Sequence, residues 1–109
     1  MLFLHLLPGL LVLLIGCILY RWPPRNINWF YGFRTHYSMR NEENWHEANS
    51  YYARLIIVIG FVSLCVSLAC FYIWPLPLSL LVPLGFMLML FAASIVLTNE
   101  HLKRKYGDW

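Results

Sequence analysis

Residues 55–74 read LIIVIGFVSLCVSLACFYIW, twenty consecutive residues that include no Lys, Arg, Asp or Glu. A helix of about 20 residues is about 30 Å long, which matches the hydrocarbon layer of a bilayer. Two other segments share this character, residues 2–20 (LFLHLLPGLLVLLIGCILY) and residues 76–97 (LPLSLLVPLGFMLMLFAASIVL). Because a backbone in lipid must satisfy its own hydrogen bonds, all three segments are predicted to be transmembrane helices.

The composition of the whole chain supports this prediction. Of its 109 residues, 61% are hydrophobic and 12% are charged, whereas about 25% are charged in a soluble globular protein. The three cysteines lie in apolar segments, where we expect them to pack between helices and not to form disulfides. The first segment could instead be a cleaved signal peptide, but no basic residue precedes it and no small-residue cleavage site follows it. We therefore expect it to be retained.

The basic residues predict the orientation in the membrane. Residues 74–77 are long enough only for a tight hairpin, so one side of the membrane receives this hairpin and the N-terminus. The other side receives the polar segment after the first helix and the C-terminal tail. All eight basic residues lie there: Arg21, Arg25, Arg34, Arg40, Arg54, Lys103, Arg104 and Lys105. The positive-inside rule makes that side cytoplasmic and leaves the N-terminus outside. A basic pI of about 8.9 therefore records orientation here and does not indicate a nucleic-acid partner.

Small residues that recur every seven positions in the sequence predict how the helices pack against each other. Such stripes let helix backbones approach closely within lipid. The stripes are Gly9 and Gly16 in the first segment, Ala53, Gly60 and Ser67 in the second, and Gly85 and Ala92 in the third. We expect a compact three-helix bundle, an all-α membrane protein, with an interface between identical copies as the alternative.

The segment between the first two spans is expected to be folded. Asn41 is a plausible N-cap, and Glu42 and Glu43 fall in the first turn, where acidic side chains are favourable. The predicted helices are therefore about 2–20, 42–74 and 76–102, with a cytoplasmic loop at 21–41 and a helical extension leading into the second span. One face of this extension carries Trp45, Ala48, Asn49 and Tyr52.

A motif in this region resembles the SdpI family of bacterial membrane proteins. It has the form Asn-x-x-x-Gly-x-Arg-Thr, followed ten residues later by Trp-x-x-x-Asn, and its residues are Asn28, Gly32, Arg34, Thr35, Trp45 and Asn49. The resemblance implies one SdpI-like transmembrane domain over residues 1–109, located in the bacterial cytoplasmic (inner) membrane. It also implies immunity to a secreted toxic peptide and, in the best-known member, signalling by holding a transcriptional repressor at the membrane.

Two roles are open for the motif's arginine. The guanidinium of Arg34 keeps its charge and offers five donors, so near a membrane it requires a carboxylate, carbonyl groups or a phosphate. One hypothesis is that it pairs with Glu42, Glu43 or Glu47 and fastens the loop to the helix. The other is that it binds a lipid headgroup or an external partner. We expect Asn28 and Asn49 to bond within turns or caps, and Trp45 to be a packing anchor.

Catalysis is not indicated by the sequence. The cytoplasmic histidines lack a metal-binding spacing such as His-Glu-x-x-His, and no carboxylate lies within a span. We expect no enzyme activity, no cofactor and no metal. Three functions remain: protection against a membrane-active peptide, a signalling or scaffolding module whose loop binds a soluble regulator, and a small accessory subunit of a larger membrane complex. The expected partners are accordingly the lipid bilayer, a peptide toxin, a cytoplasmic regulator or a second copy of the chain.

Overall fold

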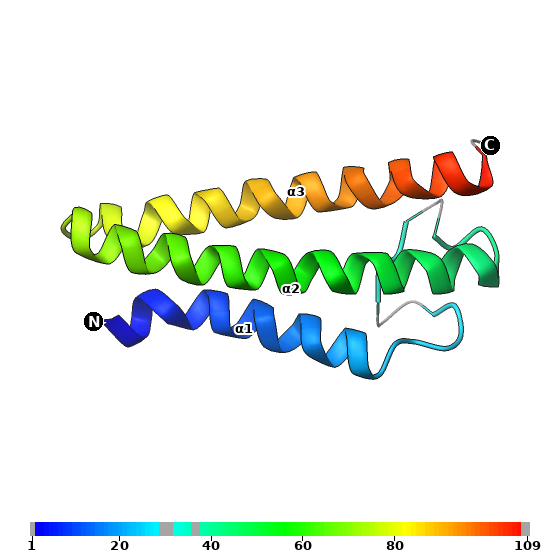
Figure 1. Ribbon diagram of the computed structural model, residues 1–109, viewed down its shortest axis with the longest axis horizontal. Helices are drawn as coiled ribbons and strands as arrows, with labels where there is room; N and C mark the ends of the chain where they lie inside the picture. Colours follow the sequence, from blue (N-terminus) through cyan, green and yellow to red (C-terminus); the bar gives the residue numbers. More distant parts are fainter. Residues whose placement is uncertain (1, 29–31, 36–37, 108–109) are drawn as a thin grey trace.

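The computed structural model describes residues 2–28, 32–35 and 38–107. These residues form three helices, α1 (Leu2–Arg21), α2 (Glu42–Ile73) and α3 (Leu78–Tyr106), and no strand (Figure 1). Each helix contains a stretch long and apolar enough to cross a membrane. The predicted all-α architecture with three membrane-spanning helices is confirmed.

The second helix is longer than a bilayer requires because its first turns lie outside the apolar segment. Its 32 residues span about 48 Å at the usual rise of about 1.5 Å per residue. Its N-cap is Asn41, as predicted, and the side chain of Asn41 accepts a hydrogen bond from the N–H of Asn44 at 2.8 Å. Glu42 and Glu43 follow in the first turn, where the helix dipole favours negative charge. The apolar part of α2 begins only at Leu55.

The third helix differs from its predicted bounds of 76–102. It begins at Leu78 because Pro77 disfavours a helical conformation at the residue before it. It continues to Tyr106 because the basic residues of its last turn stabilise the negative end of the helix. Gly107 then ends α3 with a positive φ of 92°, and its N–H donates to the carbonyl of Lys103 at 2.9 Å.

Small residues bring α1 and α2 into close contact, as their sevenfold spacing predicts. A Cβ added to Gly16 would lie 2.9 Å from the backbone nitrogen of Ile57, and one added to Gly60 would lie 2.8 Å from Cα of Leu13. At this distance the two backbones are separated by no side chain. The stripes in the first two helices are therefore interface residues.

The corresponding prediction for the third helix is wrong. Gly85 and Ala92 are exposed, and no atom lies within 4 Å of a Cβ built on Gly85. The buried face of α3 carries instead Ser79, Pro83, Ser94, Thr98 and Leu102. Hydroxyl side chains can replace glycine in such an interface because they bond to their own helix. Ser94 donates to the carbonyl of Phe91 at 2.6 Å, and Thr98 donates to that of Ser94 at 2.8 Å.

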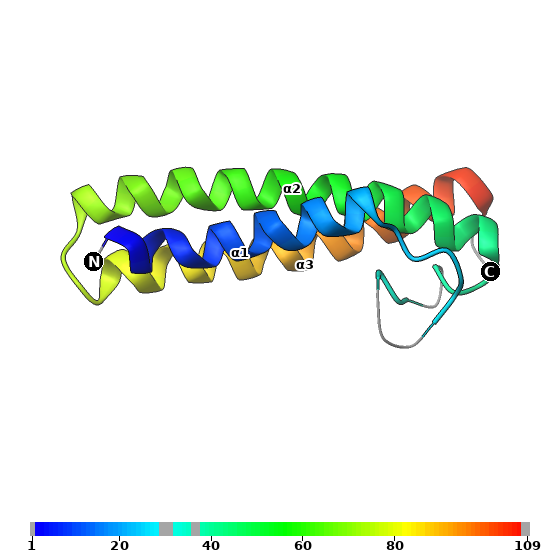
Figure 2. The same ribbon diagram turned by 90° about the horizontal axis from the view of Figure 1, so that it is seen from below.

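The long second helix holds the other two in place. It packs along both α1 and α3, whereas α1 and α3 make few contacts with each other. Figure 2 shows α1 and α3 on the same side of α2. The N-terminus and the turn between α2 and α3 lie at one end of the bundle, which we call the hairpin end. The polar segment after α1 and the C-terminal part of α3 lie at the other, which we call the loop end (Figure 1).

Candidate functional site

The polar segment between α1 and α2 folds against the loop end of the bundle. We call its described residues, 22–28, 32–35 and 38–41, together with the first three turns of α2, the loop-end cap (Figures 1 and 2). Residues 29–31 and 36–37 lie outside the described part of the chain. Four of the six motif residues form hydrogen bonds or close contacts that join the segment after α1 to α2 or to α3.

Asn49 and Gly32 form the centre of the cap. Asn49 is 1% exposed, and its Oδ1 accepts a hydrogen bond from the N–H of Phe33 at 2.6 Å while its Nδ2 donates to the carbonyl of Trp45 at 2.9 Å. Gly32 has a φ of +105°, a conformation that side chains disfavour. A Cβ on this residue would also collide with the Asn49 amide and lie 2.7 Å from Cγ of Pro24. Glycine is required here both by conformation and by space.

Within the cap, Trp45 joins the start of α2 to the segment that follows α1. Its side chain is fully buried, and its Nε1–H donates to the carbonyl of Pro24 at 2.9 Å. A buried indole N–H needs such a partner, and proline-rich backbone supplies it because the carbonyl of Pro24 is not used by a helix. Trp45 is thus buried between the start of α2 and the segment after α1.

Thr35 connects the cap to α3. Its Oγ1 donates to Oδ1 of Asn99 at 2.8 Å. Thr35 also exchanges hydrogen bonds with Ser38, whose Oγ accepts from the Thr35 N–H at 2.7 Å and whose N–H donates to Thr35 Oγ1 at 3.2 Å. Ser38 is fully buried, and its Oγ lies 2.9 Å from the carbonyl of Phe33. This short turn is therefore fixed internally before it meets α3.

Arg34 and Asn28 lie at the edge of this network. Asn28 is half-buried, and its Nδ2 donates to the carbonyl of Asn26 at 3.0 Å. Arg34 is exposed and lines an open pocket of about 200 Å³ together with Thr35, Tyr52 and Ile95. No ion pair among the residues that the structure describes includes Arg34. A guanidinium at the rim of a pocket can bind a phosphate or a carboxylate.

Glu47, one of the three carboxylates proposed as partners for Arg34, pairs with α3 instead. Glu47 accepts from Nε2 of His101 at 2.6 Å and from Nζ of Lys105 at 3.0 Å, and Tyr51 stacks on the His101 ring with centroids 4.2 Å apart. The hydrogen bond from His101, supported by that from Lys105, holds the pKa of Glu47 below its ordinary value, although partial burial opposes this. The hydrogen bond that Lys105 donates to Glu47 raises the pKa of Lys105. The Glu47–His101 pair connects α2 to α3 at the loop end.

Sequence reasoning missed several of these partners. The spacing of three between Thr35 and Ser38 is a local signal, since reciprocal bonds at this spacing are typical of capping turns. The pairing of Thr35 with Asn99 and of Glu47 with His101 joins residues 64 and 54 positions apart, and no local pattern indicates it. Within residues 2–28, 32–35 and 38–107, no three His, Cys, Asp or Glu side chains are placed to hold a metal ion.

Comparison with known proteins places this arrangement in a family. The model of the SdpI/YfhL protein family matches residues 25–98, which contain all six motif residues. The chain is 42% identical over 57 residues to a protein of Bacillus subtilis (strain 168) described as "Uncharacterized protein YfhL". That match covers 52% of each chain, so the chain spans about half the length of this relative. No solved structure matches. The resemblance predicted from the motif is confirmed, and the chain is a membrane protein that belongs to the SdpI/YfhL family.

Proposed function

We propose that this protein protects a bacterial cell against a membrane-active peptide toxin. It does so as a multi-pass protein of the cytoplasmic membrane, with its N-terminus outside and its loop end in the cytoplasm. Family membership supports the proposal, because the SdpI resemblance implies immunity to a secreted peptide. The concentration of all eight basic residues at the loop end supports the orientation.

The observation that carries the proposal is the way the motif residues are used. Gly32, Thr35, Trp45 and Asn49 join the segment after α1 to α2 and α3 through buried and partly buried contacts, so their role in the fold is to hold the bundle in shape. A protein organised in this way acts by binding. A membrane-active peptide resides in or on the bilayer, and the surface it meets there is the lipid-facing surface of the helices.

The third helix offers such a surface. Its apolar stretch is 11% buried, compared with 28% for α1 and 33% for α2. Gly85 and Ala92 lie on its open side, among larger exposed residues such as Leu88 and Met89. Small residues on a lipid-facing helix let another helix approach closely, which is the main source of helix association in membranes. We propose this side of α3 as the contact surface for the peptide.

Protection is tested in a sensitive bacterium that expresses the chain. Peptide fractions from culture supernatants of related bacteria are added, and survival and membrane potential are measured with and without the protein. We expect the parent to preserve the membrane potential. Gly85→Leu should abolish this protection at an unchanged protein level, because the bulky side chain blocks close approach. The matched control is Leu14→Phe, a bulky change at an exposed position of α1, which should protect like the parent. Equal protection by the Gly85 variant would exclude α3 as the contact surface.

A second candidate function is signalling through the loop end. The observation that favours it is the exposed Arg34 at the rim of an open pocket, at the same end of the bundle as the basic last turn of α3. Such a surface would bind an acidic patch on a soluble regulator. Purification of the protein from membranes with its bound proteins, compared with Arg34→Ala, tests this candidate. An identical set of bound proteins for both chains would argue against it.

A further inference from the structure

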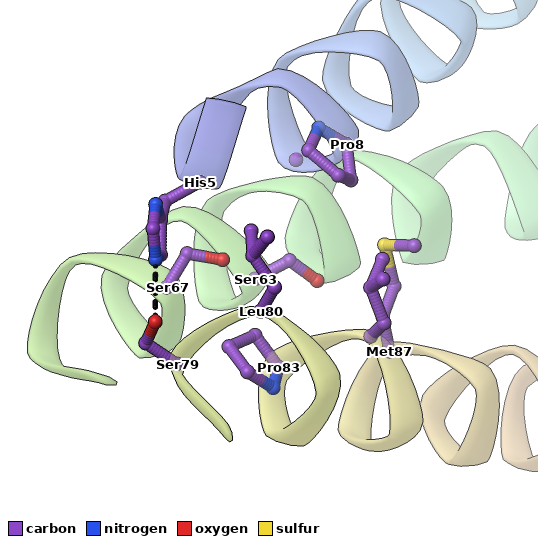
Figure 3. Close-up of a pocket in the computed structure, with 10 residues that line it drawn as sticks. His5, Pro8, Ser63, Ser67, Ser79, Leu80, Pro83 and Met87 are labelled. Atoms are coloured by element: carbon purple, nitrogen blue, oxygen red, sulfur yellow. Dashed lines mark hydrogen bonds between the residues drawn. The ribbon is translucent and has the colours of Figure 1, made fainter. Parts of the chain in front are cut away.

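A small polar pocket lies among all three helices near the hairpin end (Figure 3). Its polar residues come from α1 (His5), α2 (Ser63 and Ser67) and α3 (Ser79), and each of these residues is at most 4% exposed. Apolar atoms of prolines, leucines and Met87 complete the lining. Polar groups buried at this depth require hydrogen-bond partners, because lipid supplies none.

Two of these groups satisfy each other. Nε2 of His5 lies 2.8 Å from Oγ of Ser79, a hydrogen bond that links α1 directly to α3 (Figure 3). The His5 ring also meets the edge of Phe71 at a centroid distance of 4.9 Å. The histidine is therefore oriented from two sides.

One other polar side chain in the pocket lacks a partner. Oγ of Ser63 is buried and has no hydrogen bond within the described part of the chain. The carbonyl of Ser79 has also lost its usual helical donor, because that donor would be the N–H of residue 83, and Pro83 has none. Ser63 on α2 and Ser79 on α3 both line the pocket. In membrane helices, ordered water is one of the groups that satisfy carbonyls freed by proline.

The size of the pocket indicates which molecule fits between Ser63 and Ser79. The space open to the centre of a water molecule is about 10 Å³, and a cavity needs about 10–15 Å³ by this measure to hold one water. We propose that the pocket is a binding site for a single water molecule that accepts from Ser63 Oγ and donates to the carbonyl of Ser79. Ser67 also lines the pocket and offers a further hydroxyl group. This proposal is independent of protection against peptides.

The water would complete a connection between helices that otherwise touch little. Since α1 and α3 make few contacts, their hydrogen bond through His5 and Ser79 is a main link between them at this end. A water bonded to Ser63 and Ser79 joins α2 to that link. The alternative is a dry pocket in which Ser63 rotates and bonds to a carbonyl of its own helix, as serines in membrane helices often do.

Solid-state NMR of the protein in lipid bilayers distinguishes the two states. Magnetisation is transferred from water protons to the amides of Ser63 and Ser79, and Ser94 is the internal control because it is equally buried and bonds to its own helix. We expect transfer to Ser63 and Ser79 to exceed that to Ser94 several-fold. Equal, background transfer at all three positions would overturn the proposal.

Ser63→Val provides the second measurement. This substitution removes the hydroxyl, and the added methyl groups occupy the place of the water. The water signal at Ser79 should therefore disappear, and the protein should become less stable because the Ser79 carbonyl is left unpaired. In a dry pocket the same substitution would fill a cavity and raise stability. A Ser63→Val protein that is more stable than the parent therefore contradicts the proposal. Ser94→Val is the matched control for a valine in a buried helix position.

Discussion

Replacing Gly32 by alanine tests whether the loop-end cap is a rigid part of the fold. Two separate costs follow from the structure. The positive φ of +105° costs about 1–3 kcal/mol for a residue with a side chain. The added Cβ would also press against the Asn49 amide and Pro24, and such overpacking costs about 1–3 kcal/mol. We therefore expect Gly32→Ala to lower the free energy of unfolding by about 2–6 kcal/mol, a large part of the ~5–15 kcal/mol typical of a domain.

Gly107→Ala separates the two costs. Gly107 also has a positive φ, +92°, but no atom lies within 4 Å of a Cβ built there. The variant should therefore show the conformational cost alone, about 1–3 kcal/mol at most. Unfolding is measured in mixed micelles by titration with a denaturing detergent, followed by circular dichroism. If Gly32→Ala is no more destabilising than Gly107→Ala, the surroundings of Gly32 give way to the added Cβ, and the cap is not rigid.

Four further predictions follow from the structure. Gly60→Ala should lower stability by about 1–3 kcal/mol through overpacking against the α1 backbone, whereas Gly85→Ala, in open surroundings, should leave it equal or higher; detergent titration compares them. The pKa of Glu47 is lowered in the folded state, so ionised Glu47 stabilises the fold fully above the ordinary pKa of 4.5, and this stabilisation is lost as the pH falls through the lower pKa of the folded state. Glu47→Gln should flatten this part of the curve of stability against pH. Arg34→Lys should leave stability unchanged, since the arginine is exposed, but weaken any function that needs its planar fork; unaltered activity in the protection or regulator assay would argue for a passive role. The amide of Phe33 should exchange with deuterium slowly, as its acceptor is buried, and fast exchange there would indicate a flexible loop.

The membrane architecture could be predicted because it depends on properties that are local in sequence. Length and the absence of charge define three spans, and Asn41 with the two following glutamates defines the start of α2. The positions of Trp45 and Asn49, four residues apart, place them on one helical face, and both are buried there. Local periodicity is enough for such features, because burial in a helix repeats with the turn of the helix.

The partners across the bundle could not be predicted, because they depend on how the helices are rotated. The third helix is the clearest case. Its small residues Gly85 and Ala92 suggested one face for packing, but the face that contacts α2 is that of Ser94 and Thr98. These two side chains satisfy their hydroxyls within α3 and so pack as small apolar residues would. The sequence pattern alone does not rank a glycine stripe against a serine and threonine stripe.

The rotation of the helices also determines where hydrogen bonds connect distant segments of the bundle. Hydrogen bonds between distant segments lie at the two ends, Thr35 with Asn99 and Glu47 with His101 at the loop end, and His5 with Ser79 at the hairpin end. Between these ends α1 and α3 make few contacts with each other, and each packs along α2, with glycine against backbone between α1 and α2 and with a small apolar cluster that includes Ile56. Packing in lipid depends weakly on direction, whereas hydrogen bonds depend on it strongly. The hydrogen bonds at the two ends therefore determine how each helix is rotated, and the packing between the ends adjusts to that rotation. The family motif supplies one of these two fixed ends, which explains why the polar side chain of Asn49 is buried there.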